Sequence, residues 1–518
     1  NTLKYLKAKQ VFFRFYYFFK RNILKNKYLK IIKSNYNPIV WHDVINNYPS
    51  FFVKDLTFVF LNISHSFCKE IDWNYQNHGK LWIYNLNYFE FLNQEKISRK
   101  EGVLLIKDFL KNKRNLKDAN EQYPISLRCI NWVKFLSKNK IHNKEIDCHL
   151  YNDFVFLSKN LEYHLLGNHL LENAFSLLFG AYYFQDKKLY HKSRTLLEKE
   201  LEEQILKDGA HFELSPMYHQ IILYRLLDCL NLIKFNRLWI VEDFKIYLEK
   251  KARLMLSWLK NITYQNGDIP MVNDSTYNIA PTSNQLFNFA KKLGIAYELQ
   301  NFSISGYRKF KTKKYELFLD VGDICSDYQP GHSHSDIFNF ELIKEGKPIF
   351  VDSGISTYEK NVIRQNERIT CSHNTVQINN IEQTQVWGGF RVANRAKVKI
   401  LSESNNQIQA IHDGYKKEGF FHKRTFKWQE NKITLKDEIN KSTNNKSKAF
   451  FHLHSSINLP TIKDNKVIFN DLALIISFVN LSDIDIKTYE LSHGFNFKKP
   501  AYKIVVSFDT TLITKIQL

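Results

Sequence analysis

The sequence predicts an α+β protein of several domains, in which an all-helical part is followed by an antiparallel β-sandwich. Two observations carry this prediction. Up to about residue 300, apolar residues recur every three or four positions, as on one face of a helix. Beyond about residue 305 they alternate with polar residues, as in half-buried strands. The chain has 518 residues, of which 44% are hydrophobic, so it can fill several cores and is not a wholly disordered protein.

The helical pattern is interrupted by short polar connectors, which divide it into separate helices. The predicted helices cover 102–113, 125–137, 151–165, 170–184, 189–205, 217–233 and 244–258. Ser215-Pro216 is a start signal for the sixth of them, with Ser as the cap and Pro in the first turn. Because no fixed-period repeat is found, we expect paired helices in an array or ring rather than a regular solenoid.

The second part consists of short alternating segments between polar turns, which is typical of an antiparallel sheet or sandwich. The predicted strands are 315–321, 338–343, 398–400, 407–412, 425–428, 433–435, 467–469, 475–478 and 502–508. We therefore expect a basic aromatic helical segment over 1–80, a helical domain over 81–304 and a sheet domain over 305–518. No linker rich in Pro, Gly or Ser divides the last two, which predicts a tight interface, a common place for a binding cleft.

The charge favours an anionic partner. Lys and Arg number 74 against 52 Asp and Glu, a net charge of +22. An acidic glycan, nucleic acid or an anionic membrane surface would suit it, as would a charge simply spread over a solvated surface. Since no nucleic-acid-binding motif is present, we expect no nucleic acid partner. The six cysteines form no CxxC pair and are expected to be free thiols.

The N-terminal residues 11–20 read VFFRFYYFFK. Arg14 interrupts the apolar run and no small-residue cleavage site follows, so the segment does not read as a signal peptide. No stretch of about 20 apolar residues predicts a transmembrane helix. We expect a basic aromatic helix that packs on the body or contacts a membrane surface. A cytoplasmic or membrane-peripheral location is favoured over a periplasmic one. The sequence does not decide whether the protein is exported.

Two clusters of polar residues lie in the helical part. In GNHLLEN, Asn168 and Glu172 are four residues apart and share a helix face, with His169 beside them. In DGAHFELSPMYH, a glycine turn leads into a capped helix that presents Tyr218. A Tyr can serve as general acid or base. The alternative for both clusters is a structural role in caps, core contacts and hydrogen bonds.

Two further clusters lie in the sheet part. In GHSHSD, His332 and His334 would point to the same side of an extended chain, as a metal site or a catalytic pair requires. Asp352 in VDSG and His373 in SHNT would complete a plausible zinc site with His334. Alternatively, Asp352 caps a turn and His373 is an interior residue with satisfied hydrogen bonds.

Taken together and in this order, YPISLRCINW, GNHLLEN, DGAHFELSPMYH, GHSHSD, VDSG and SHNT resemble the heparinase II/III-like polysaccharide lyases. The resemblance covers roughly residues 80 to 430. It implies an incomplete (α/α) toroid followed by antiparallel β-sheets, with the substrate in the cleft between them. It also implies eliminative cleavage of a glycan that contains uronic acid, with an acidic polysaccharide as the partner.

Elimination requires a group that neutralises the uronate carboxylate, a base for the C5 proton and an acid for the leaving oxygen. The resemblance implies that Asn168 and His169 hold the carboxylate. Tyr218 would act as base, acid or both, and His332 as its partner, while Glu172 would orient this group. The substrate binders implied with them are Arg128, Glu213 and His219.

The resemblance also implies a structural divalent metal held by His334, Asp352 and His373. We expect zinc rather than calcium, because calcium prefers more oxygen ligands. Two other functions stay open. A glycoside hydrolase or transferase would need paired carboxylates, for which Glu172, Glu213 and Asp274 are candidates. A non-catalytic glycan-binding protein of a capsule assembly system would bind without turnover.

Overall fold

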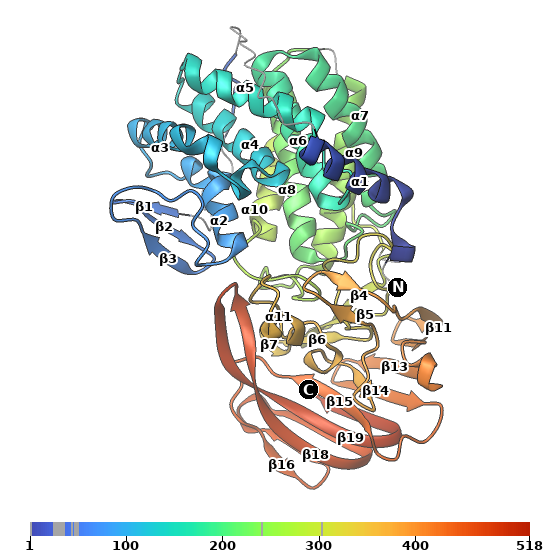
Figure 1. Cartoon of the computed structure of the whole chain (residues 1–518). Coiled ribbons are helices and arrows are strands. Elements are labelled where there is room, and N and C mark those ends of the chain that lie inside the picture. The colour runs from blue at the N-terminus through green and yellow to red at the C-terminus, as the bar shows by residue number, and fades with distance from the viewer. Residues whose placement is uncertain (1–2, 24–36, 43–44, 46–50, 240–241, 302–303) are drawn as a thin grey trace.

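The computed structural model describes residues 3–23, 37–42, 45, 51–239, 242–301 and 304–518. A helical part and a β-sheet part lie against each other in that order along the chain (Figure 1). This confirms the predicted α+β class. Among the described residues, no helix combines the length and the apolar character needed to cross a membrane.

The segment before residue 80 differs from the helical expectation. Helix α1 covers Ala8–Ile23, but a three-stranded antiparallel sheet follows, formed by β1 (Phe51–Val53), β2 (Thr57–Phe60) and β3 (Ile63–Ser66). The alternating Phe58 and Phe60 are fully buried, so the segment folds as a strand with one apolar face. The parts of the expected segment at 24–36, 43–44 and 46–50 lie outside the described residues.

The helical domain is built around α6. Every residue of α6 except His169 is buried, and α4, α5, α7 and α8 pack around it. A helix that is buried on all sides belongs in the middle of a core. The helices are α2 (Lys80–Tyr88), α3 (Arg99–Asn112), α4 (Gln122–Lys138), α5 (Lys144–Lys159), α6 (Gly167–Phe184), α7 (Lys187–Gln204), α8 (Pro216–Phe235), α9 (Glu242–Ile262) and α10 (Ser283–Leu293).

The β-domain contains two stacked sheets, in which all strand pairs are antiparallel. The smaller has the order β4-β5-β6-β7, with β4 (Tyr307–Lys311), β5 (Tyr315–Asp320), β6 (Phe340–Lys344) and β7 (Lys347–Phe350). The larger contains β8 (Val376–Ile378), β11 (Val398–Ser404), β12 (Gln407–His412), β13 (His422–Gln429), β14 (Lys432–Ile439), β15 (Ser447–His452), β16 (Thr461–Lys463), β17 (Lys466–Phe469), β18 (Leu474–Gly494) and β19 (Phe497–Gln517). One apolar core joins Leu317 and Leu342 of the smaller sheet to Phe426 and Val506 of the larger, as in a sandwich.

The smaller sheet also joins the two parts of the molecule. Tyr307, Phe318 and Ile343 belong to the same apolar core as the helices. A short helix, α11 (Val362–Asn366), and a two-stranded hairpin of β9 (Val386–Trp387) and β10 (Arg391–Val392) lie outside both sheets. The loops that carry them reach the junction between the two parts, where the candidate site lies.

Candidate active site

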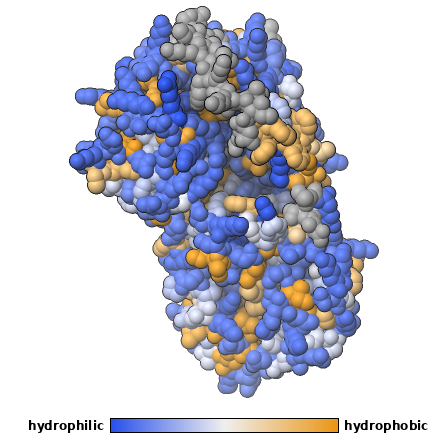
Figure 2. Space-filling view, viewed as in Figure 1, coloured by the Kyte–Doolittle hydropathy of each residue, from blue (hydrophilic) through white to orange (hydrophobic). Residues whose placement is uncertain are grey.

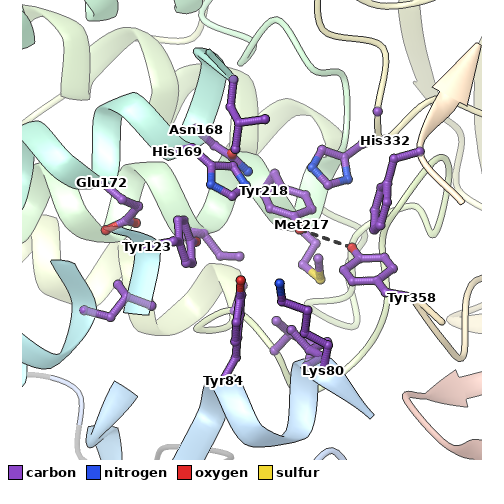
Figure 3. A pocket seen from close by; sticks show the side chains of 18 of the residues that line it. Lys80, Tyr84, Tyr123, Asn168, His169, Glu172, Met217, Tyr218, His332 and Tyr358 are labelled. Carbon is purple, nitrogen blue, oxygen red and sulfur yellow. Dashed lines mark hydrogen bonds between the residues drawn. The ribbon is translucent and has the colours of Figure 1, made fainter. Parts of the chain in front are cut away.

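A cavity of about 1120 Å³ lies at the junction of the helical domain and the β-domain. Its helical side is formed by α2, α4, α6 and α8, and its other side by loops of the β-domain. Figure 3 shows side chains from these elements pointing into one space. The five residues predicted to be catalytic all line it: Asn168, His169, Glu172, Tyr218 and His332.

Backbone geometry at the start of α6 places Asn168. Gly167 has a φ of +59°, and a Cβ there would lie 2.7 Å from Oε1 of Glu213, so only glycine fits. This close approach lets the backbone N–H of Asn168 donate to Glu213 Oε1 over 3.1 Å. The side-chain oxygen of Asn168 is buried and has no hydrogen-bond partner among the described residues. An amide held this way at a cavity wall is available to a ligand.

Tyr218 and His332 face each other across the two domains. The predicted Ser215 cap is present and accepts a hydrogen bond from the Tyr218 backbone N–H, which fixes Tyr218 in the first turn of α8. Its ring centroid lies 3.9 Å from that of His332, and its hydroxyl is 3.2 Å from the hydroxyl of Tyr358. Burial raises the pKa of Tyr218 above its usual value, so the phenol is protonated in the resting site.

Asp274 organises the histidines. Its Oδ2 is 2.8 Å from Nδ1 of His332 and its Oδ1 is 2.8 Å from Nε2 of His334. Arg364 donates to both oxygens, at 2.5 and 2.6 Å. Burial alone would raise the pKa of Asp274, but the Arg364 guanidinium and the two imidazoles outweigh burial and hold this pKa well below its usual value. Asp274 is therefore a carboxylate, and Nδ1 of His332 is the nitrogen that carries the proton.

His169 and Glu172 lie on the α6 side of the cavity. His169 Nδ1 is 3.0 Å from Glu162 Oε1, and the imidazole packs on the Tyr123 ring with centroids 4.6 Å apart. Burial opposes charging of His169, but Glu162 outweighs it and raises the pKa of His169. The Glu172 carboxylate is fully buried and lies 3.3 Å from Nε of Arg225. Burial raises the pKa of Glu172 in spite of this arginine.

None of the three expected substrate binders lines the cavity. Arg128 is fully buried in the helical core, where it donates to the Ala119 carbonyl and to Asp153. His219 is also buried, with Nε2 3.0 Å from the Met255 carbonyl. Glu213 lies behind the cavity wall, 3.4 Å from Nε2 of His332, so it can act on the site only through its neighbours.

The expected metal ligands are brought together in part. Asp352 and His373 are 2.7 Å apart and form a buried group with Asp336, in which the possible ligand atoms lie within 4.8 Å of one another. Asp336 thus takes the place expected for His334 in this group, while His334 Nε2 lies 2.8 Å from Oδ1 of Asp274. The His334 ring nevertheless lies 5.3 Å from the His373 ring.

Sequence reasoning missed Tyr358 and Arg364, and it identified Asp274 only as a hydrolase candidate. Arg364 lies 90 residues from Asp274 along the chain, and Tyr358 lies 140 residues from Tyr218. No local pattern marks either residue. It also missed Tyr123, and with it Lys80 and Tyr84 on α2, which line the helical side of the cavity.

Comparison with known sequences agrees with this architecture. The profile described as heparinase II/III N-terminus matches residues 1–294, and the profile described as heparinase II/III-like, C-terminal, matches residues 295–517. The chain belongs to the heparinase II/III family. The family boundary near residue 294 coincides with the end of α10 at Leu293.

Individual family relatives are distant. A heparin-sulfate lyase of Bacteroides stercoris is 26% identical over 253 residues, which is 43% of this chain and 37% of that protein. A heparin-sulfate lyase of Bacteroides thetaiotaomicron is 26% identical over 258 residues, or 41% and 36% of the two chains. The aligned part thus spans little more than a third of these relatives. The crystal structure of heparinase III superposes with a TM-score of 0.73 at 18% identity, covering 99% of this chain and 91% of that one, which shows a shared fold.

Proposed function

We propose that the protein is a polysaccharide lyase that cleaves an acidic, uronic-acid-containing glycan by β-elimination. The observation that carries this is the meeting of Tyr218, His332 and the unpartnered amide of Asn168 in one cavity, from two domains. The heparin-sulfate lyases among its family relatives support an acidic glycan as substrate. The basic residues that line the cavity support it too: Arg14, Lys80, Arg225, Lys360 and Arg391.

The proposed chemistry assigns one role to each side chain. The Nδ2 amino group of Asn168 and the His169 imidazole, whose pKa Glu162 raises, bind the uronate carboxylate as donors, which makes the C5 proton more acidic. His332 Nε2 takes that proton, because Asp274 holds the proton of the ring on Nδ1. The C5 electron pair forms the C4–C5 double bond as the C4–O bond breaks. Tyr218, kept protonated by burial, protonates the leaving oxygen.

The geometry does not favour a hydrolase. Its candidate carboxylates are engaged: Glu172 faces Arg225, Glu213 accepts from the backbone of Asn168, and Asp274 is clamped by Arg364. Glu213 and Asp274 are fully buried, so neither can reach a glycosidic bond.

An ultraviolet assay tests the proposed function. The protein is incubated with heparan sulfate, heparin, hyaluronan, chondroitin and alginate, and absorbance of the conjugated double bond is followed. We expect absorbance to rise on at least one glycan and to vanish in Tyr218→Phe and His332→Ala. A flat trace with new reducing ends would establish hydrolysis instead. A flat trace with binding but no new ends would establish a binding protein.

We also propose a structural divalent metal, zinc by its donor set, held by Asp336, Asp352 and His373. The residues fit such an ion, because Asp336 Oδ2 and His373 Nε2 are buried and no described residue bonds to either atom. Burial, with a further contribution from Asp352, raises the pKa of Asp336 to about 6, although His373 opposes the shift. A bound cation would stabilise the ionised form of this buried carboxyl group. His334 Nδ1 is likewise buried without a partner in the described parts of the chain, so His334 is the fourth candidate ligand.

Helix α1 supports a third proposal, contact with an anionic membrane surface. Its inner side packs on the body through Phe13, whose ring lies 4.7 Å from Tyr163. Its outer side exposes Phe12, Phe15 and Phe18 by more than 60% each, a patch that Figure 2 shows as hydrophobic. The exposed aromatic residues of α1 are Phe12, Phe15, Tyr16, Phe18 and Phe19. The helix has four basic residues and no acidic one, the composition of a helix that binds anionic lipid.

A further inference from the structure

The β9–β10 hairpin is a tight ribbon at the edge of the cavity. Arg391 pairs with Trp387, and the loop between the strands is Gly388-Gly389-Phe390. Both glycines have positive φ, +58° and +80°, and nothing crowds the Cβ position of Gly389. The glycines therefore allow the backbone conformation of this three-residue hairpin loop, which fixes the positions of the flanking side chains.

This hairpin presents exposed rings and an arginine to the cavity. Trp387 is 39% exposed and Phe390 is 41% exposed, although both line the cavity. The Arg391 guanidinium lies 4.7 Å from the centre of the Trp387 ring. Within the described ranges, Arg391 forms no ion pair with an acidic side chain. Large exposed rings of this kind are uncommon without a binding role when they gather at a cavity.

The hairpin is tied directly to the reacting groups. The Gly389 carbonyl accepts hydrogen bonds from Arg364 Nε over 3.1 Å and from Arg368 Nη1 over 2.8 Å. The same Arg364 clamps Asp274, which holds His332. The Phe390 ring lies 6.0 Å from the His332 ring. A ligand on the hairpin would thus lie next to the sugar unit whose C5 proton His332 takes. Arg364 would fix its position, because this arginine bonds to both the hairpin and Asp274.

We infer that this hairpin is a binding site for one acidic sugar unit of the glycan, adjacent to the unit that reacts. Trp387 provides an apolar surface for the C–H face of a pyranose ring, and Arg391 pairs with an anionic substituent, a carboxylate or a sulfate. The inference deepens the proposed function and rests on it for the identity of the ligand. The hairpin supplies affinity and register rather than a reacting group, so Trp387 and Arg391 are binding residues.

Direct binding tests the site without relying on turnover. A heparan sulfate oligosaccharide of defined size and its chemically desulfated form are titrated into the Tyr218→Phe protein by calorimetry. The variants Trp387→Ala, Trp387→Phe and Arg391→Gln are added to that background. Matched controls are Phe421→Ala, an equally exposed ring away from the cavity, and Lys466→Gln, an exposed cation of β17. Thermal unfolding of each variant verifies the fold.

We expect Trp387→Ala to weaken binding about tenfold, because aromatic rings that a ligand covers contribute much of the binding energy. Trp387→Phe should retain most of the parent's affinity. Arg391→Gln should weaken binding about fivefold, less at high salt. A loss confined to the sulfated form assigns the arginine to a sulfate, and an equal loss on both forms assigns it to a carboxylate. In the active protein, Trp387→Ala should raise KM more than it lowers kcat.

The outcomes separate this inference from the proposed function. Cleavage by the parent protein with binding unchanged within twofold in Trp387→Ala and Arg391→Gln would overturn the hairpin site alone. No cleavage, but binding that depends on Trp387 and Arg391, would overturn the lyase and keep the site. Neither cleavage nor binding of any acidic oligosaccharide would overturn both.

Discussion

Asp274 accepts the Nδ1 proton of His332 over 2.8 Å, and this hydrogen bond decides which imidazole nitrogen is basic. In the Asp274→Asn variant the amide can donate to Nδ1 and favour the opposite tautomer, which leaves Nε2 protonated. We expect kcat to fall about 100-fold or more, as in other sites where a carboxylate orients a histidine. The initial rate of absorbance increase, per folded protein, measures this.

Asp274 also pairs with Arg364, so the variant needs a control for stability. Removing one partner of a buried ion pair costs about 3–5 kcal/mol. Assays are therefore run well below the unfolding temperature of the variant, with circular dichroism to verify folding. If folded Asp274→Asn keeps kcat within threefold of the parent, Asp274 does not position His332 for catalysis.

The fold class was predictable because it depends on short-range spacing. The helices predicted at 125–137, 170–184 and 217–233 correspond to α4, α6 and α8. The strand prediction at 475–478 found only the start of β18, which continues to Gly494. Most of the missed part, residues 479–490, has no buried position and many polar residues, so the sequence shows no apolar face there.

The site was predictable only where chemistry and local pattern coincide. Asn168, Tyr218 and His332 each lie in a short motif, and they line one cavity. For Arg128 the local pattern is not sufficient. The spacing of residues along a helix does not distinguish an arginine that faces the core from one that faces the cavity. The link between Arg364 and Asp274 depends on tertiary structure alone, because the two residues meet only in the folded chain.

Zinc content tests the metal proposal. We expect about one zinc per chain by elemental analysis, and a fall in unfolding temperature of about 5 °C or more when a chelator removes it. His373→Ala should abolish zinc binding, because it removes a buried nitrogen ligand, whereas the exposed His191→Ala should leave it intact.

Two further variants decide the ligand set. Zinc loss in Asp336→Asn would support the group found in the structure, and loss in His334→Ala would add His334 as a ligand. A folded parent protein that contains no metal and gains no stability from added zinc would rule the site out.

Vesicle flotation tests the α1 surface. We expect the protein to float with vesicles that contain phosphatidylglycerol and to remain free with pure phosphatidylcholine, since both lipid charge and apolar insertion contribute. Replacing Phe15, Phe18 and Phe19 together by Ser should abolish flotation, whereas Phe421→Ser with Phe497→Ser, at two exposed rings elsewhere, should not. Equal flotation of the α1 variant and the control variant would exclude the α1 surface as a membrane contact. If the parent protein is a dimer and the α1 variant is a monomer, the surface binds a second copy of the chain instead.

We expect a buried ion pair in the large sheet to contribute to stability against acid. Asp437 accepts hydrogen bonds from Arg424 Nε over 2.6 Å and from His422 Nε2 over 2.7 Å, and all three side chains are fully buried. Burial alone would raise the pKa of Asp437, but Arg424 and His422 outweigh it and lower this pKa to about 2. Arg424 also donates to the carbonyls of Phe338 and Asn374, so the pair links β13 and β14 to the segments that lead into β6 and β8.

Because the pKa of Asp437 is lower in the folded state, its stabilisation is complete above the unfolded pKa of about 3.9 and is lost as the pH falls toward 2. This shift corresponds to about 2–3 kcal/mol. Urea unfolding at pH 7, 4 and 3 should show that Asp437→Asn is less stable than the parent by about 3–5 kcal/mol at pH 7, and that the difference shrinks as the pH falls. The exposed Asp464→Asn should show no such trend. A difference for Asp437→Asn that is constant from pH 7 to pH 3 would mean that this carboxylate does not carry the acid sensitivity, because a titrating ion pair cannot contribute equally on both sides of its transition.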